Sequence, residues 1–174
     1  TDDDLARMDM QPDGFGELYQ RYVPRIYRYL ISRVGNSADA EDLTTQVFMD
    51  AYRRLPEYRP RGQFAAWLFT IASRRAADYH RQQQKTTNLE LDDLISDDPD
   101  PLQITIKQEY FSDLEKLIRQ QSPVEQELLR LHFAADLTYQ QIARVTGRSY
   151  AGVKMSMSRL LRRMRKFWEN EHEN

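Results

Sequence analysis

The chain has 174 residues, which is enough for one ordinary domain or two small ones. It contains no Cys, which excludes disulfides, thiolate metal sites and cysteine nucleophiles, and its three His lack the spacing of metal ligands. No apolar run is long enough to span a membrane, and the first residues are polar. We therefore expect a cytoplasmic protein with no membrane insertion, no metal and no cofactor.

The net charge of −2 hides four blocks of alternating sign. Residues 1–51 carry a net charge of −5, and residues 86–115 carry −8. Residues 52–85 carry +6, and residues 116–174 carry +5. Two basic blocks separated by an acidic one predict two surfaces for a polyanion, joined by a connector that the polyanion repels.

The first helical pattern runs from Phe15 to Val34. Its apolar residues, Tyr19 among them, are spaced by three and four, which predicts an amphipathic helix with a broad buried face. Pro24 lies inside this pattern and should kink or split the helix. Gly35 should end it.

Two further helical patterns follow. One begins at a cap formed by Asn36 or Ser37 and carries an apolar stripe. The other runs from Phe64 to about Arg81. Three helices with facing apolar stripes predict one small helical domain.

We expect this first domain to span residues 1–85, a linker to span 86–101, and a second domain to span 102–174. The linker is acidic, contains two Pro and lacks helical periodicity, so it is predicted to be flexible. In the second domain, Ser122 followed by Pro123 predicts a helix start. No segment alternates as a strand would, so the predicted fold class is all-α.

Residues 139–158 have the pattern of a helix-turn-helix. Thr138 is the expected cap of the first helix, and Ala143 is small where two helices must approach closely. Gly147 stands where the turn needs a positive φ, and Val153 anchors the second helix. An ordinary helical hairpin with no role in DNA binding is the alternative reading of this pattern.

Charge argues against that alternative. From Arg144 to Lys166 the chain carries eight Arg or Lys and no acidic residue, whereas a structural surface helix usually mixes charges of both signs. Contact with phosphates explains this bias, and the second helix would enter the major groove by its amino-terminal end. The expected DNA contacts are Arg148, Ser149, Tyr150, Lys154, Ser158, Arg159, Arg162 and Arg163.

The basic block at residues 52–85 is rich in aromatic side chains. Basic and aromatic residues together suit single-stranded nucleic acid, because aromatic rings stack on bases. Most of these rings, including Phe64 and Trp67, are expected in the core. Tyr58 lies in a loop and is the expected base contact.

The order and spacing of these motifs resemble the extracytoplasmic-function sigma factors of bacteria. The likeness covers residues 15–81 and 110–166. In the first domain it rests on Phe15-x-x-Leu18-Tyr19, Ala38-Asp39-Ala40-Glu41-Asp42-Leu43-Thr44, Val47-Phe48, Phe64-x-x-Trp67-Leu68-Phe69-x-Ile71-Ala72 and Asp78-x-x-Arg81. In the second it rests on Ser122-Pro123, Glu127-Leu128, Leu131, Thr138-Tyr139, Ile142-Ala143, Gly147 and Val153-Lys154.

The resemblance implies a sigma factor whose first domain is region two and whose second is region four, the helix-turn-helix that reads the minus-thirty-five element. Its partners would be core RNA polymerase, through the β′ and β subunits, and promoter DNA, with an anti-sigma factor as a further candidate. The implied polymerase contacts are Asp39, Glu41, Asp42, Thr45 and Gln46. The residues implied to open and read the minus-ten element are Tyr58, Arg59, Arg61, Gln63, Arg74, Arg75 and Arg81.

The chain departs from the family pattern at two places. Ser73-Arg74 stands where Arg-Asn is common, and Gly152-Val153-Lys154-Met155-Ser156 stands where Thr-Val-Lys-Ser-Arg is common. Both departures lie near the expected DNA contacts, so they affect which promoter sequence is read.

Two other functions fit parts of the sequence. A dimeric helix-turn-helix regulator would need an oligomerisation surface, which no sequence feature supplies. An enzyme could use Asp39, Glu41 and Asp42, but these acids also suit the dipole of a helix start. No nucleophile or Gly-rich phosphate loop accompanies them, so neither catalytic residues nor a small-molecule substrate are expected.

Overall fold

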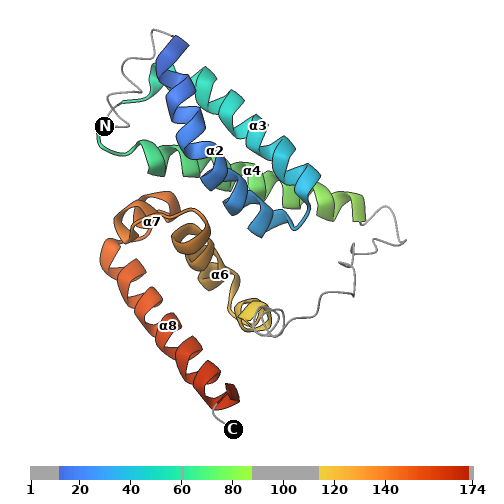
Figure 1. Cartoon of the computed structure of the whole chain (residues 1–174), viewed down its shortest axis with the longest axis vertical. Helices are drawn as coiled ribbons and strands as arrows, with labels where there is room; N and C mark the ends of the chain where they lie inside the picture. The colour runs from blue at the N-terminus through green and yellow to red at the C-terminus, as the bar shows by residue number, and fades with distance from the viewer. Residues whose placement is uncertain (1–11, 60, 88–113, 173–174) are drawn as a thin grey trace.

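The computed structural model describes residues 12–59, 61–87 and 114–172. Across these ranges the secondary structure is helical and contains no strand, which confirms the all-α prediction. Figure 1 shows two groups of helices, α2 to α4 and α6 to α8. Among the described residues, no helix is both long enough and apolar enough to cross a membrane.

The first group consists of α2 (Pro12–Val34), α3 (Ser37–Arg54), the 3-10 turn η1 (Leu55–Glu57) and α4 (Phe64–Thr87). All three helices bury one apolar stripe in a shared core. The largest fully buried side chains of this core are Leu18, Tyr22, Ile26, Tyr29, Leu30, Leu68 and Phe69.

The predicted helix ends of this group are largely confirmed. Gly35 adopts a φ of 73° after α2, and the side chain of Asn36 accepts a hydrogen bond from the Asp39 amide at 3.0 Å. Of the two outcomes predicted at Pro24, a kink or a split, the split does not occur, because α2 continues through this residue. Tyr19 was expected on the buried face of α2 but is 43% exposed.

Helix α4 is longer than predicted. It continues from Arg81 to Thr87, because the intervening Gln and Lys residues are good helix formers although they carry no apolar stripe. The first two residues of the expected linker are therefore helical. The rest of that linker, and the start of the expected second domain, lie outside the described residues.

In the second group, residues 114–119 are helical and are followed by α6 (Pro123–Leu129), which continues as the π-helical turn η2 (Arg130–Ala134). Helices α7 (Tyr139–Thr146) and α8 (Tyr150–His172) form the helix-turn-helix.

Local sequence signals set the ends of these helices. Ser122 and Thr138 each form a complete capping box at the start of α6 and α7. Gly147 ends α7 with a φ of 70°, and the Ser149 hydroxyl accepts the Gly152 amide at 3.1 Å to cap α8. The turn predicted from the sequence is therefore confirmed.

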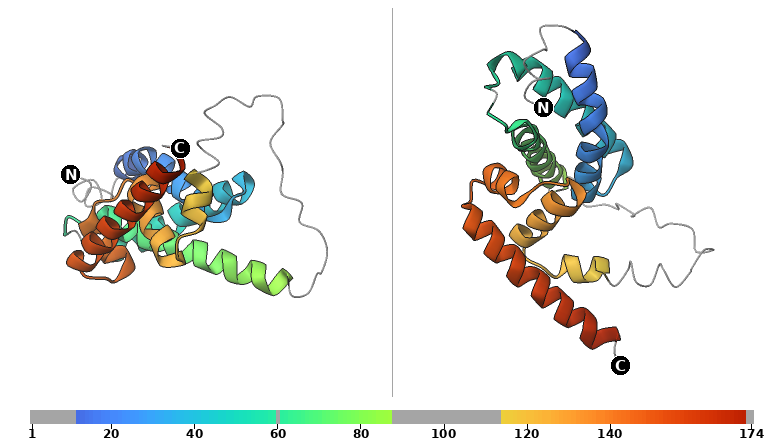
Figure 2. Two further views of the ribbon diagram at one scale, coloured as in Figure 1. Left: turned by 90° about the horizontal axis from the view of Figure 1, so that it is seen from below. Right: turned by 60° about the vertical axis from the view of Figure 1, so that its left-hand side comes forward.

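The two groups pack against each other rather than standing apart. Helix α7 lies on α4, and η2 lies on α2, while α8 runs on the far side of α6 and α7 (Figure 2). The buried residues of both groups form one continuous apolar cluster.

His80, near the end of α4, is half-buried close to this junction. Burial lowers the pKa of His80, and the positive charges of Arg33 on α2 and Arg130 on η2 lower it further. A hydrogen bond to the Arg33 backbone acts in the opposite direction. The folded chain therefore holds this imidazole neutral more strongly than the unfolded chain does.

We expect acid to destabilise the fold through His80. Below the ordinary histidine pKa of about 6.5, the unfolded chain binds a proton that the folded chain binds less readily. This contribution to stability is present above that pH and is lost as the pH falls. Melting temperatures measured between about pH 7.5 and about pH 5.5 should fall less for His80→Asn than for the wild type. An identical pH dependence of the two proteins would contradict this account.

Candidate nucleic-acid interface

Helix α8 divides cleanly into a buried and an exposed side. Val153, Met157 and Leu160 are fully buried against the rest of the second group. Lys154 and Ser158 are exposed and lie four residues apart, and Arg162 continues the same side. Met155 is also exposed, at 53%. Of the predicted DNA contacts on α8, Lys154, Ser158 and Arg162 therefore lie on one exposed face.

The start of α8 presents three further predicted contacts, Arg148, Ser149 and Tyr150, all of them exposed. The Arg148 guanidinium donates to the Ser156 hydroxyl at 3.3 Å. Ser156, where the resemblance led us to expect an Arg, therefore contacts Arg148 in this structure.

Arg163 differs from its neighbours, because it is tied to helix α6. It donates to the Glu125 carboxylate at 2.6 Å and to the Gln121 amide oxygen at 3.0 Å. Hydrogen bonds from Arg163 and Ser122 hold the pKa of Glu125 below its ordinary value. Arg163 therefore joins α8 to α6. Of the later basic residues, Arg159 and Arg162 are better placed than Arg163 to contact DNA.

Four of the predicted minus-ten residues line one groove of about 470 Å³ between η1 and α4. Trp67 of α4 forms part of its wall, and the Tyr58 ring lies 4.8 Å from the Trp67 ring. Trp67 is only half-buried, in contrast to the core position expected for it. Arg144 of α7 also lines this groove. The loop residues that the groove brings together are Tyr58, Arg59, Arg61 and Gln63.

The other three predicted minus-ten residues lie outside the groove. Arg75 pairs with the buried carboxylate of Asp50 at 2.5 Å, so it joins α4 to α3. Arg81 pairs with Asp78 on its own helix. Arg74 is exposed. The structure thus separates a groove built by the loop from arginines further along α4.

The predicted polymerase contacts lie on α3. Glu41, Asp42, Thr45 and Gln46 are exposed and form one strip along the helix. Asp39 is different, because it accepts a hydrogen bond from the Tyr79 hydroxyl of α4 at 2.7 Å. Burial raises the pKa of Tyr79, and so does this contact with Asp39.

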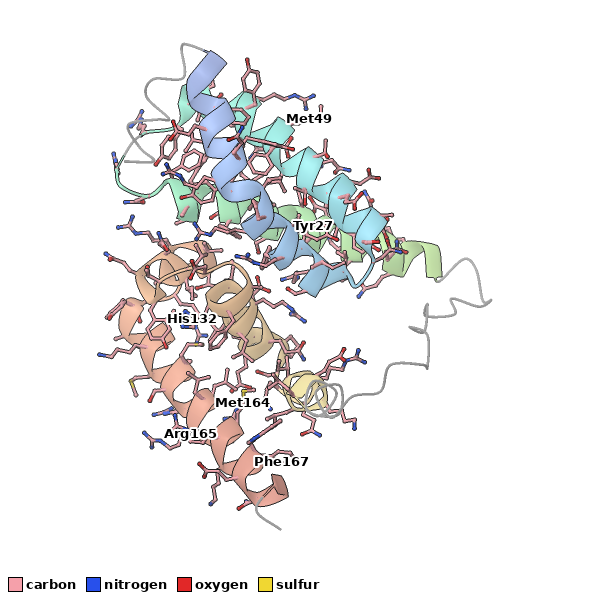
Figure 3. All side chains as sticks on the ribbon, in the orientation of Figure 1. Tyr27, Met49, His132, Met164, Arg165 and Phe167 are labelled. Atoms are coloured by element: carbon pink, nitrogen blue, oxygen red, sulfur yellow. The ribbon has the colours of Figure 1, made fainter. Side chains whose placement is uncertain are left out.

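Two apolar residues that the sequence analysis did not select extend this strip. Met49 is 49% exposed on the outer side of α3 (Figure 3), and Tyr52 is 62% exposed. Met49 follows Thr45 by four residues and falls off the buried stripe of α3, a spacing that could have revealed it. An acidic strip that ends in exposed apolar side chains suits a protein partner.

Both halves of the chain match a known family. Residues 18–86 match Sigma-70 region 2, and residues 111–164 match Sigma-70, region 4. The sequence is 33% identical to the ECF RNA polymerase sigma factor BldN of Streptomyces coelicolor, over 87% of this chain and 59% of BldN. It is 29% identical to the ECF RNA polymerase sigma factor SigM of Bacillus subtilis, over 86% of this chain and 91% of SigM.

The chain thus spans about three-fifths of the length of BldN and most of the length of SigM. Two solved structures share its fold. One is CnrH in complex with the cytosolic domain of CnrY, with a TM-score of 0.71, 17% identity and 97% of each chain covered. The other is the sigma factor RpoE in complex with the anti-sigma factor NepR from Bartonella quintana, with a TM-score of 0.67 and 20% identity, covering 89% of this chain and 96% of that one.

Adjacent arginines on α4 should behave differently when replaced. Arg75→Ala leaves the buried Asp50 carboxylate without its closest partner, so we expect a loss of about 1–3 kcal/mol in the free energy of unfolding. Arg74→Ala removes an exposed side chain and should change stability by no more than about 0.5 kcal/mol. Chemical unfolding of both variants measures the difference, and equal losses would refute the structural role of Arg75.

Proposed function

Because this chain belongs to the extracytoplasmic-function group of the sigma-70 family, we propose that it binds core RNA polymerase and directs transcription from specific promoters. The observation that carries the proposal is the presence of two different candidate surfaces for nucleic acid in one chain. The outer face of α8 suits duplex DNA, and the groove beside α4 suits an unpaired base. A dimeric helix-turn-helix regulator would need only the first surface, and the comparisons give that alternative no support.

In this proposal the acidic strip of α3 binds the β′ subunit of the polymerase, and region 4 lies near the β subunit. Glu41, Asp42, Thr45 and Gln46 would make the polar contacts, with Met49 as an apolar contact at the end of the strip. Asp39 would contribute indirectly, through its hydrogen bond to Tyr79.

The groove would capture a base of the displaced strand at the minus-ten element. Tyr58 and Trp67 offer aromatic surface, and Arg59 and Arg61 offer positive charge for the backbone. Stacking on aromatic side chains contributes about 1–3 kcal/mol per base. This is a binding and strand-opening role, in which the chain itself catalyses no reaction.

We further propose an anti-sigma factor as a regulator of this chain, by analogy with RpoE of Bartonella quintana, whose structure contains the anti-sigma factor NepR. The proposed place of action is the cytoplasm, where polymerase and promoter meet.

Core binding provides the first test of the function. Adding the chain to sigma-free core polymerase should yield promoter-specific transcripts. The double variant Glu41→Lys, Asp42→Lys should stay folded, because exposed changes usually shift stability by less than about 0.5 kcal/mol, yet bind core polymerase more weakly. The control variant Glu17→Lys, Glu169→Lys changes the net charge equally at exposed positions outside the strip. Unchanged core affinity in the strip variant, or an equal loss in the control, would remove α3 from the interface.

The recognition helix provides a second test. Lys154 lies near the amino-terminal end of α8, where bases are read, and Arg162 lies two turns further along. Lys154→Ala should relax the base preference in the upstream element by about 1–3 kcal/mol. Arg162→Ala should weaken binding to all sequences alike and reduce the salt dependence by about one unit of slope. A promoter library transcribed with each variant measures both, and the reverse pattern would contradict this placement of α8 in the groove of the DNA.

A further inference from the structure

The two regions meet through a hydrogen-bonded carboxylate. The Tyr29 hydroxyl of α2 donates to one oxygen of Glu127 at 2.5 Å, and the Arg33 guanidinium donates to the other. Tyr29 is fully buried, and the side chains of Arg33 and Glu127 are each only 16% exposed. Burial raises the pKa of Tyr29, and the charge of Glu127 raises it further. Glu127, a residue of region 4, is therefore held by two groups of region 2.

A second set of contacts lies one helical turn away. Arg25 donates to the backbone carbonyls of Ala135 and Asp136, each at 2.9 Å, and Arg28 donates to that of Ala134 at 3.2 Å. These carbonyls lie at the carboxyl end of η2, where a helix leaves acceptors unsatisfied and carries partial negative charge. The arginines of α2 thus donate hydrogen bonds to the free carbonyls at the end of a helix that belongs to region 4.

A third contact runs in the opposite direction. Arg130 of η2 donates to the backbone carbonyl of Ser32 at 3.0 Å. Both regions therefore supply donors and acceptors to the interface. The interface thus combines an apolar cluster with hydrogen-bonded polar groups. Such polar groups are typical of domains that separate and reassociate, because water can replace the lost partners.

This docking has a consequence for the groove beside α4. Helix α7 packs on α4, and Arg144 of α7 lines the groove together with Tyr58 and Trp67. A strand of DNA that entered the groove would meet region 4. Helix α8, in contrast, lies on the far side of α6 and α7 from region 2 (Figure 2). The closed arrangement thus places region 4 at the edge of one nucleic-acid surface and leaves the other open.

We propose that α2 is a docking surface for region 4 of the same chain, with Glu127 as its latch, and that the docked state restricts access to the groove until the regions separate. The inference rests on the proposed function for the role of the groove, but the docking itself requires neither polymerase nor DNA. The latch is reversible, because Tyr29, Arg33 and Glu127 regain water when the regions part.

The test uses the full chain, whose lack of Cys allows a pair of labels at introduced cysteines. Gln20→Cys on α2 and Asn170→Cys on α8 are exposed positions, one in each region. The distribution of distances between the labels then reports closed and open chains directly. We expect Glu127→Gln to raise the ratio of open to closed chains about tenfold, equivalent to about 1.4 kcal/mol.

Glu125→Gln is the matched control. It carries the same substitution on the same helix, but its ion pair with Arg163 lies within region 4. It should leave the distance distribution unchanged. Tyr29→Phe is the milder latch variant, because it removes the hydroxyl donor and keeps the aromatic ring. The centroid of this ring lies 5.7 Å from that of Phe69. It should open the chain in the same direction as Glu127→Gln.

The covering of the groove has its own readout. In a Trp168→Phe background, Trp67 is the sole tryptophan, and its quenching by acrylamide should increase in both latch variants. If folded latch variants keep the wild-type distances, the docking proposal is wrong. If the distances lengthen while Trp67 quenching stays constant, region 4 does not cover the groove. Failure of the sigma function would appear instead as absent transcripts, with these distances unaffected.

Discussion

The carboxylate of Glu127 is the interaction on which the arrangement of this chain depends. It accepts hydrogen bonds from Tyr29 and Arg33 at a junction that excludes most water. A largely buried carboxylate is costly without partners, so the donors of α2 help to keep region 4 in this position. The contacts of Arg25 and Arg28 with the end of η2 add to the same docking. In the proposed closed state, access to the groove beside α4 depends on this junction and on the packing of α7 on α4.

The same chain also shows how one helix can serve three purposes. Helix α4 gives Phe69 and Ala72 to the core, Trp67 to the groove, and Arg75 to the ion pair with α3. Because α7 packs on this helix as well, the groove cannot be considered apart from region 4. Access to the groove is then a property of the whole chain, whereas the basic face of α8 depends on region 4 alone.

Local signals allowed much of the fold to be predicted from the sequence. Ser122, Thr138 and Gly147 act within a few residues of themselves, so the capping boxes and the turn were predictable. Helix α4 was predicted too short, because its polar end has helix propensity without an apolar stripe. Tyr29 shares a helical face with Tyr22 and Ile26, so its burial could have been predicted from spacing. Its hydrogen bond to Glu127, 98 residues away, could not.

In the candidate sites, too, local features were predictable and contacts between distant residues were not. Exposed residues of α3 and α8 were predictable from helical spacing, because spacing fixes which residues share a face. The ion pairs of Arg75 with Asp50 and of Arg163 with Glu125 were not predictable, because the partners come from other helices. An arginine in a basic block looks the same in sequence whether it binds DNA or another helix.

A double-mutant cycle between Arg33→Gln and Glu127→Gln tests the central claim most directly. The free energy of unfolding of the full chain would be measured for the wild type, both single variants and the double variant. If region 4 docks on α2 in solution, the two changes should not add, and the coupling energy should be about 1 kcal/mol or more. A coupling energy indistinguishable from zero would mean that these two side chains do not meet in the free chain, and would contradict the account.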